Sequence, residues 1–359
     1  MAKKFIISGG GTGGHIFPAI AIANALKARV ADAEILFVGA EGRMEMEKVP
    51  AAGFKIIGLK IAGFQRTQIW KNWSLPFKII GSLLTARKVV REFKPDVAIG
   101  VGGYASGPLL AAAALSGVPC LIQEQNSFAG ITNRILSRIV KKICVAYEGM
   151  DAVFPKEKII CTGNPVRAQL TAATVTKEAA QQFFQLNNHQ PVIFVSGGSL
   201  GARTLNESVH CNLETLSQQG VQVIWQTGKS WNQPVTDTPG IKQLPFIEQM
   251  EMAYAAADVI IARAGALTIA ELQIIGKPVI LVPSPNVTDD HQTHNAMALV
   301  KQHAALLIKD SDARAMLIPA ALNLLKDEEQ QKQLALRCRQ MAITNATDRI
   351  VDEILKLSA

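Results

Sequence analysis

The sequence has few cysteines, and none of them is paired in a short motif. No C-x-x-C spacing occurs among the 359 residues, and the number of cysteines is odd. A disulfide framework and a structural zinc site are therefore not expected. Isolated thiols in apolar runs are usually buried small side chains, which fits a reducing compartment. The five positions are Cys120, Cys144, Cys161, Cys211 and Cys338.

Long apolar runs and low-complexity tracts are also missing. The most apolar stretch, 109–122, is interrupted by Gly117 and Pro119 and is too short to span a bilayer. Lys3 and Lys4 precede only three apolar residues, too few for the core of a signal peptide. With 48% hydrophobic and 18% charged residues, the composition is that of a globular protein. We expect a soluble, cytoplasmic chain of two domains.

The positive charge is concentrated in the first half of the chain. Residues 1–165 hold 21 lysines and arginines against 11 acidic residues, and residues 166–359 hold 16 against 18. A basic N-terminal half predicts an anionic partner there, either a membrane surface or nucleic acid.

Two glycine-rich turns, about 185 residues apart, are the strongest positive signal. Residues 9–14 follow the apolar run Phe5–Ile7 and precede a helical pattern over 17–26. Residues 197–201 follow a second apolar run, 192–195. A strand, a glycine turn and a helix begin a nucleotide-binding α/β unit, because glycines allow close approach to phosphate and the helix start favours anions. We therefore predict two doubly wound domains that face each other across a cleft.

Short apolar runs alternate with helical patterns along the whole chain. Continuous apolar runs are typical of parallel strands buried on both faces, and the alternation predicts βαβ units. Gly163-Asn164-Pro165 is turn-rich and marks the expected junction, which gives domains over 1–165 and 166–340 and a C-terminal segment over 341–359. The predicted strands are 4–8, 34–39, 54–59, 97–101, 119–123, 142–146, 158–161, 192–196, 221–226, 241–244, 258–262, 278–282 and 304–308.

His15 stands at the predicted first turn of the helix after the first glycine turn. A helix N-terminus disfavours the imidazolium, so a neutral ring there is suited to act as a general base. The alternative is a histidine that only caps the helix. Gly9, Gly11 and Gly14 also match G-x-G-x-x-G, which would suggest NAD with Glu41 as a weak ribose ligand.

Other polar or glycine-rich segments follow predicted strand ends, where ligands of open α/β sheets bind. They are Gly102–Pro108, which includes Tyr104, and Gln123-Glu124-Gln125-Asn126. Ordinary loop polarity would also explain the second segment. In the second half, Glu271 lies one turn into a predicted helix and could bind both ribose hydroxyls of a nucleotide. A capping box with Thr268 as the cap is the alternative.

Asp289-Asp290-His291 could be interpreted as a metal cluster, but aspartates are also common at helix starts. We expect no metal site.

An aromatic and basic segment lies between residues 64 and 78. Trp70, Trp73 and Phe77 alternate with basic residues, and further basic residues follow up to Lys94. This mixture suits a membrane-interface patch, although single-stranded nucleic acid or a packed loop would fit the same residues.

Taken together, these motifs resemble those of the MurG family of peptidoglycan glycosyltransferases, almost from end to end. The resemblance rests on 10–15, 102–104, 124–126, 163–167, 197–199, 265–268 with Glu271, and Gln292 with Asn295-Ala296. It implies a GT-B fold and transfer of N-acetylglucosamine from its UDP donor to lipid I, which gives lipid II. It also implies an N-terminal acceptor domain at the inner face of an anionic membrane, with Tyr104 on the acceptor side.

By this resemblance, Glu271 would hold the ribose, the backbone of Ile247 the uracil, and Ser199 with its turn the diphosphate. The remaining donor-side residues would be Thr12, Gly13, Gly14, Asn126, Arg167, Ala266, Leu267, Thr268, Ile269, Ala270 and Gln292. The final helix, about 344–358, would pack on the N-terminal domain. Leu200 and His291 depart from the glutamines frequent in the family, which leaves a side-chain contact at Leu200 in question.

The implied reaction is one inverting displacement that requires no metal or other cofactor. His15 would be the base, with Glu124 as the alternative base or as support for the acceptor. The expected partners are UDP-N-acetylglucosamine, lipid I, the membrane and other cell-wall enzymes, but not nucleic acid. Rival functions are a glycolipid synthase, an NAD-dependent oxidoreductase and a non-catalytic sugar-nucleotide sensor.

Overall fold

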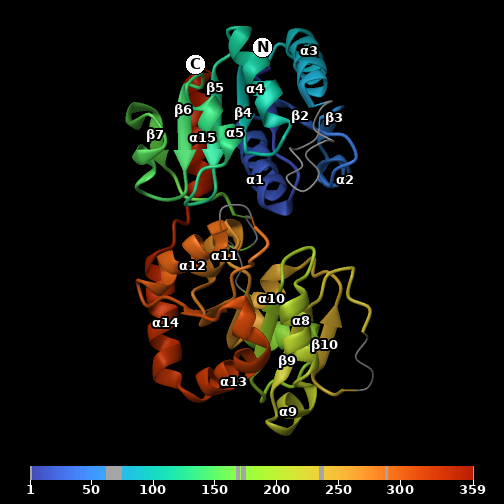
Figure 1. Cartoon of the computed structure of the whole chain (residues 1–359), viewed down its shortest axis with the longest axis vertical. Coiled ribbons are helices and arrows are strands. Elements are labelled where there is room, and N and C mark those ends of the chain that lie inside the picture. Colours follow the sequence, from blue (N-terminus) through green and yellow to red (C-terminus); the bar gives the residue numbers. More distant parts are fainter. Residues whose placement is uncertain are drawn as a thin grey trace. The chain divides into compact units, whose positions relative to one another are not determined.

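The chain forms two compact α/β units. The computed structural model describes residues 2–61, 75–166, 170, 175–233, 238–287 and 290–358. The first unit consists of Met1–Arg167 with Asn345–Ala359, and the second of Ala168–Thr344. Figure 1 shows a parallel sheet with helices on both faces in each unit. The predicted class of two doubly wound α/β domains is confirmed.

The sheet of the first unit has seven parallel strands in the order β3-β2-β1-β4-β5-β6-β7. The strand order reverses between β1 and β4, so the carboxyl end of β1 lies at the switch point, where open sheets bind ligands. Each strand lies within two residues of its predicted position. The strands are β1 (Lys4–Ser8), β2 (Glu34–Ala40), β3 (Lys55–Leu59), β4 (Val97–Gly100), β5 (Cys120–Glu124), β6 (Lys142–Val145) and β7 (Ile159–Cys161).

Helices cover both faces of this sheet because its strands are apolar on both sides. Phe5 pairs in register with Ile35 and Val97 and is fully buried. Side chains of α1, α2 and α15 form one core with β1, and side chains of α3, α4 and α5 form the other. The helices are α1 (Gly13–Arg29), α2 (Glu45–Ala51), α3 (Leu75–Phe93), α4 (Ser106–Leu115), α5 (Ile131–Leu136) and α15 (Ala346–Leu357), with the 3₁₀ turns η2 (Met150–Ala152) and η3 (Lys156–Lys158).

The C-terminal helix α15 belongs to the first unit. Its residues Ile350, Val351 and Ile354 are fully buried in the core that α1 also lines. Arg29 of α1 pairs with Asp352 across this contact at 2.6 Å. The helix therefore completes one face of the first sheet after the chain has built the second unit.

The second sheet has six parallel strands in the order β10-β9-β8-β11-β12-β13. Its switch point lies between β8 and β11, so the second glycine turn also follows the switch-point strand. Its predicted strands are confirmed, although the last is only two residues long. The strands are β8 (Val192–Ser196), β9 (Gln222–Gln226), β10 (Ile241–Leu244), β11 (Val259–Ala262), β12 (Val279–Leu281) and β13 (Leu306–Leu307).

Helices also cover both faces of the second sheet. One core contains side chains of α8, α9 and α13, and the other contains side chains of α7, α10, α11 and α12. Cys338 of α14 is fully buried in the second core. The helices are α7 (Lys177–Phe183), α8 (Arg203–His210), α9 (Leu213–Gln218), α10 (Met250–Ala256), α11 (Ala266–Ile275), α12 (His291–Val300), α13 (Ala313–Lys326) and α14 (Glu328–Gln340), with η5 (Asp310–Asp312).

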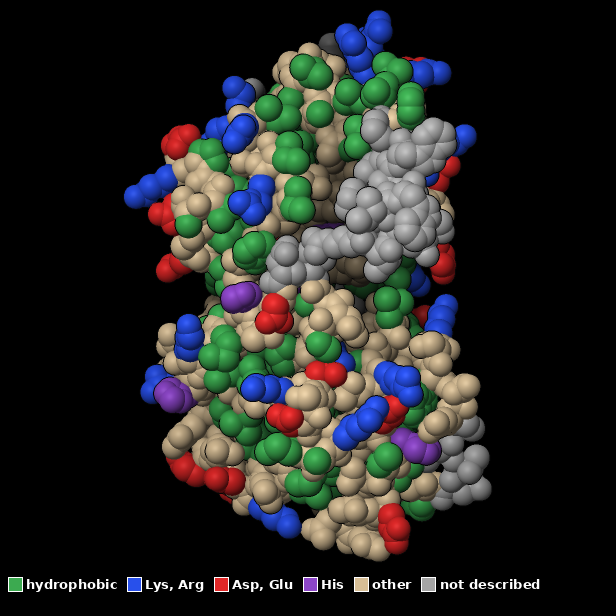
Figure 2. Space-filling model, viewed as in Figure 1, with side chains coloured by type: hydrophobic (Ala, Val, Ile, Leu, Met, Phe, Trp, Pro, Cys, Tyr) green, Lys and Arg blue, Asp and Glu red, His purple; other side chains and the backbone are tan. Residues whose placement is uncertain are grey.

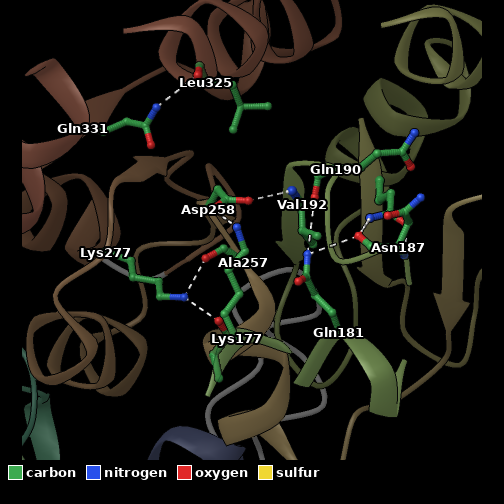
Figure 3. Close-up of polar contacts among 12 residues, drawn as sticks. Lys177, Gln181, Asn187, Gln190, Val192, Ala257, Asp258, Lys277, Leu325 and Gln331 are labelled. Atoms are coloured by element: carbon green, nitrogen blue, oxygen red, sulfur yellow. Dashed lines mark hydrogen bonds and ion pairs between the residues drawn. The ribbon is translucent and has the colours of Figure 1, made fainter. Parts of the chain in front are cut away.

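The amino-terminal ends of β8 and β11 are joined by structural polar contacts, shown in Figure 3. Asp258 pairs with Lys177 at 2.5 Å and accepts the N–H of Val192 at 2.9 Å. Lys277 donates to the carbonyls of Ala255 and Ala257, both at 2.6 Å, and burial lowers the pKa of its ammonium to about 8. These contacts lie at the edge opposite to the glycine turn.

Two expectations about local structure are corrected. Helix α1 begins at Gly13 rather than Phe17, because the glycine turn leads directly into the helix, and Pro18 lies inside it. The cysteines are all free, but Cys211 is exposed and Cys161 half-buried, so burial holds only for the other three. None of the helices in the described ranges is long and apolar enough to cross a membrane.

Candidate active site

The first glycine turn packs against a second glycine loop at the switch point of the first sheet. Gly10 donates its N–H to the carbonyl of Gly102 at 3.3 Å. A side chain at Gly103 would place its Cβ 2.5 Å from the carbonyl oxygen of Gly10, and the φ of Gly103 is +92°. Only glycine satisfies both conditions. The loops after β1 and β4 therefore form one surface.

A buried carboxylate that sequence analysis missed supports this glycine turn. Glu45 of α2 is 1% exposed and accepts the N–H of Gly11 at 2.9 Å and that of Ala40 at 3.0 Å. The only signal in the sequence was a carboxylate soon after the second strand, where Glu41 had been considered instead. Because Glu45 occupies the Gly11 N–H, that group is not available to a phosphate. Among the described residues, no acceptor is paired with the N–H of Thr12, Gly13 or Gly14.

His15 lies at the third residue of α1, as predicted, and faces the loops after β4 and β5. Its Nδ1 is 2.9 Å from Oε1 of Gln125. A Cβ on Gly102 would come within 2.6 Å of the same nitrogen, so the ring lies directly against the backbone of that loop. The side chain is half-buried. The first unit therefore brings His15 together with the segment after β5.

Glu124 is more deeply embedded than its predicted place in a polar loop suggests. It ends β5 and is 2% exposed. Its Oε1 accepts the backbone and side-chain N–H groups of Asn126, and its Oε2 accepts those of Gly130 and Asn133, at 2.9–3.3 Å. Each oxygen thus binds two donors, and Gly130 is the N-cap of α5. Gln123 and Gln125 are also buried, so ordinary loop polarity does not describe this segment.

The remaining predicted residues of the first unit fall into two groups. Tyr104 is 45% exposed at the start of the segment before α4, and Phe77 is 72% exposed on α3. Trp70, Trp73 and Arg167 lie outside the described residues.

In the second unit, the loops after five neighbouring strands meet at the carboxyl edge of the sheet. The glycine turn after β8 approaches the loop after β9 closely, because a Cβ on Gly201 would lie 1.9 Å from the carbonyl oxygen of Thr227. Ser199 is half-buried in this turn, and Leu200 is 71% exposed. The turn therefore presents Ser199 and backbone groups at the switch point.

Gln226 connects the glycine turn with the loop after β10. Its Nε2 donates to Gly198 O at 2.9 Å and to Ser196 Oγ at 3.3 Å. Its Oε1 accepts the N–H of Ile247 at 2.9 Å. This residue was not predicted from the sequence, although a glutamine at the end of an apolar strand was a signal. Ile247 also lines a pocket of about 860 Å³ whose wall includes Phe246 and Trp231.

Glu271 is buried within α11 and held by a tyrosine. Its Oε2 accepts the hydroxyl hydrogen of Tyr254 at 2.9 Å, and Tyr254 packs edge-on against Phe194 with 5.5 Å between ring centroids. The capping-box alternative is wrong, because Gly265 is the N-cap of α11 and Thr268 lies inside the helix. Helix α11 thus carries the predicted segment Ala266, Leu267, Thr268, Ile269, Ala270 and Glu271 with its N-terminus at the carboxyl edge.

Gln292 and Asp290 shape the loop before α12. Gln292 accepts the N–H of Ser284 at 2.9 Å, which ties α12 to the loop after β12. Asp290 is the N-cap of α12 and accepts the hydroxyl hydrogen of Thr293 at 2.7 Å. Within the described ranges, no group of three His, Cys, Asp or Glu residues could hold a metal ion. Asp289 lies outside those ranges.

Comparison with known proteins places both units in one family. Residues 5–145 match the glycosyltransferase family 28 N-terminal domain, and residues 192–350 match the glycosyltransferase family 28 C-terminal domain. The crystal structure of Acinetobacter baumannii MurG has a TM-score of 0.77 and 32% sequence identity, with 99% of each chain covered.

Curated relatives carry the name UDP-N-acetylglucosamine–N-acetylmuramyl-(pentapeptide) pyrophosphoryl-undecaprenol N-acetylglucosamine transferase. The protein from Parabacteroides distasonis is 54% identical over 99% of this chain and 98% of its own length. The protein from Cytophaga hutchinsonii is 55% identical over 99% of this chain and 96% of its own length. The chain therefore belongs to glycosyltransferase family 28 and, within it, to the MurG family of N-acetylglucosamine transferases.

Proposed function

We propose that this chain transfers N-acetylglucosamine from UDP-N-acetylglucosamine to the 4-hydroxyl of the N-acetylmuramoyl unit of lipid I, which gives lipid II. The observation that carries this proposal is the identity of more than half of the residues to transferases of that name over nearly the whole chain. The two glycine turns at the two switch points support it, because each unit then offers backbone N–H groups to a phosphorylated substrate.

The second unit would bind the donor. Glu271 offers a buried carboxylate to the ribose hydroxyls, and Ser199 with its turn lies at the switch point, where the diphosphate would bind. The N–H of Ile247 is already bound to Gln226, so its carbonyl is the group through which the backbone would contact uracil. The N-terminus of α11 would stabilise the charge of the departing UDP.

The first unit would bind the acceptor and supply the base. The proton of the muramoyl 4-hydroxyl passes to Nε2 of His15 while that oxygen attacks the anomeric carbon. The bond between this carbon and the diphosphate oxygen breaks, and UDP leaves with the electron pair. A single displacement inverts the α linkage of the donor to a β linkage.

The environment of Glu124 favours His15 over Glu124 as the base. Both carboxylate oxygens of Glu124 already accept two hydrogen bonds, and the group is buried. Proton transfer to this carboxylate would break bonds that hold Asn126 and the start of α5. Glu124 therefore acts by shaping the loop of Asn126, which would reach the donor sugar. We further propose that helix N-termini neutralise the leaving group, so that no metal ion is required.

An exposed apolar surface on the first unit is the proposed membrane-contact site. We define the α3–α5 patch as the exposed residues Phe77, Ile80 and Leu84 of α3, Leu115 of α4, and Ile131, Ile135 and Ile139 at and after α5. Helix α4 contacts both α3 and α5, so these residues lie on neighbouring helices. Figure 2 shows hydrophobic side chains (green) together with lysines and arginines (blue) on the upper part of the first unit, where Figure 1 labels α3 and α4.

The charge around the α3–α5 patch supports an anionic bilayer as its partner. Arg87, Lys88 and Arg91 continue the same face of α3 beyond Leu84, and Arg134 and Arg138 accompany the isoleucines. Apolar side chains surrounded by basic residues suit the headgroup region of such a bilayer. We propose peripheral association with the cytoplasmic face of the cell membrane.

Acceptor choice tests the proposed function against the closest rival. Purified protein is incubated with labelled UDP-N-acetylglucosamine and either a lipid I analogue or diacylglycerol, in the same detergent. We expect label in the lipid I product only. Label in diacylglycerol and not in the lipid I analogue would contradict the proposal and identify a glycolipid synthase.

A further inference from the structure

Three buried side-chain amides connect the Gly163-Asn164-Pro165 turn with His15. Gln123, Gln125 and Asn164 are 0%, 2% and 5% exposed. Gln123 donates from Nε2 to Oδ1 of Asn164 at 3.0 Å. Gln125 donates from Nε2 to Oε1 of Gln123 and presents its own Oε1 to His15 Nδ1 at 2.9 Å. The three amides thus form a continuous hydrogen-bonded chain from the turn after β7 to α1.

Backbone carbonyls determine the orientation of the amides at both ends. Gln125 Nε2 also donates to Val101 O at 2.7 Å, and Asn164 Nδ2 donates to Gln125 O at 3.0 Å. A carbonyl can only accept, so a flipped amide at either position would place two oxygens in contact. With Asn164 fixed, Gln123 must present its NH₂ to Asn164 and its oxygen to Gln125. Every amide in the chain therefore has one permitted orientation.

This orientation determines the tautomer of His15. The atom that faces Nδ1 is Gln125 Oε1, which has no hydrogen, so Nδ1 must carry the proton and donate it. In the neutral ring the lone pair is then on Nε2. A chain of amides that all point in one direction also polarises each member and strengthens each bond.

We propose that Asn164, Gln123 and Gln125 are positioning residues that hold His15 as the Nδ1–H tautomer, with Nε2 as the proton acceptor. The catalytic consequence rests on the proposed function of His15 as the base, but the tautomer does not. Asn164 acts on His15 through Gln123 and Gln125, which lie between them in the hydrogen-bonded chain. The Gly163-Asn164-Pro165 turn, which was predicted only as the junction between the domains, thus also orients the amides that hold His15.

The tautomer is measured directly in the full-length protein labelled with ¹⁵N-histidine. Long-range ¹H–¹⁵N spectra distinguish a protonated ring nitrogen from one that carries a lone pair, and comparison with His15→Gln assigns the signals. We expect a protonated Nδ1 and an unprotonated Nε2 at a pH where the ring is neutral. A protonated Nε2 in the wild type would overturn the proposal, and this result does not depend on the folding of any variant.

Asn164→Leu tests the far end of the chain. Without its anchor, Gln123 can turn its NH₂ toward the NH₂ of Gln125, which leaves the bond to Val101 O alone to oppose a flip of Gln125. We then expect both His15 tautomers to be populated, with kcat about 10-fold lower and the KM for UDP-N-acetylglucosamine unchanged. Asn206→Leu is the matched control, because Asn206 is a buried asparagine with two hydrogen bonds in the second unit. It should leave the His15 signals as in the wild type.

The possible results separate this proposal from the proposed function. An unchanged tautomer in Asn164→Leu would overturn the positioning chain, whether or not kcat falls, because a fall alone reports only a structural role. Nδ1–H in the wild type, a tautomer mixture in the variant and no transfer to lipid I by the wild type would support the chain and overturn the function.

Discussion

Among single residues, the buried carboxylates are the least expected from the sequence. Glu45, Glu124 and Glu271 are each at most 4% exposed, and each is held by donors from the neighbouring loops or helices. The free-energy cost of burying a carboxylate is offset only when the charge is well hydrogen-bonded. Glu124 was identified by its position after a predicted strand, and Glu271 by its position one turn into a predicted helix. Glu45 was missed because its donors, Ala40 and Gly11, are brought to it by tertiary structure.

Removal of the tyrosine hydroxyl that binds Glu271 should weaken donor binding. In Tyr254→Phe the carboxylate loses one oriented hydrogen bond of about 1 kcal/mol, so we expect the Kd of UDP to rise about 3- to 10-fold. Isothermal titration calorimetry measures it. With a UDP analogue that lacks both ribose hydroxyls, wild type and variant should bind alike. A loss of affinity that is equal for both ligands would contradict the role of Glu271 at the ribose.

The buried thiol of Cys338 should lower the stability of the second unit in alkali relative to a variant that lacks this thiol. Burial raises the pKa of this thiol from 9.0 to about 12. The group contributes stability that is complete below pH 9 and is lost as the pH rises toward 12, because only the unfolded chain releases the proton in that range. The loss between pH 8 and pH 10.5 is about 2 kcal/mol.

Urea unfolding at the two pH values tests this expectation. From pH 8 to pH 10.5, the free energy of unfolding of the wild type should fall by about 2 kcal/mol relative to that of Cys338→Ala. The buried ammonium of Lys277 changes the free energy of unfolding with pH in the opposite direction, and this effect is the same in the wild type and in Cys338→Ala. Cys211→Ala changes an exposed thiol in the same unit and should behave as the wild type. An identical pH dependence of the wild type and Cys338→Ala would show that the Cys338 thiol is not the cause.

At the scale of elements, strands were predicted better than helix ends. Continuous apolar runs such as Phe5–Ile7 and Val259–Ala262 identify strands that are buried on both faces. The start of α1 was less well predicted, because the glycine turn permits this helix to begin at Gly13, before the apolar pattern that starts at Phe17. The contribution of α5 to the α3–α5 patch was not predicted either. Its isoleucines alternate with Arg134 and Arg138, and only the fold shows that they lie beside α4.

Helix α3 should determine a large part of membrane affinity. The triple variant Phe77→Ser, Ile80→Ser, Leu84→Ser removes one apolar face, and we expect its recovery with anionic vesicles in flotation to fall at least about 10-fold. Leu336→Ser changes an exposed leucine of α14 in the second unit and serves as the control. Equal recovery of the triple variant and the wild type would exclude this face as the contact site.

At the scale of the whole molecule, the duplicated strand, glycine turn and helix made the two-unit fold predictable. The roles of Gln123 and Gln125 were not predictable, because hydrogen-bond direction depends on which backbone carbonyls the fold places nearby, here Val101 O and Gln125 O. The same applies to Gln226, whose partners Gly198 and Ile247 come from loops after different strands. Local sequence identifies elements and exposed motifs, whereas long-range polar contacts require the fold.

The most direct test of the account is transfer of labelled N-acetylglucosamine to a lipid I analogue by the wild type and by His15→Ala, with UDP binding measured in parallel. We predict transfer by the wild type and a fall in kcat of about 100-fold or more in the variant, with the Kd of UDP unchanged, because only the proton acceptor is lost. Full turnover by His15→Ala, with UDP bound as in the wild type, would contradict the assignment of the base to His15.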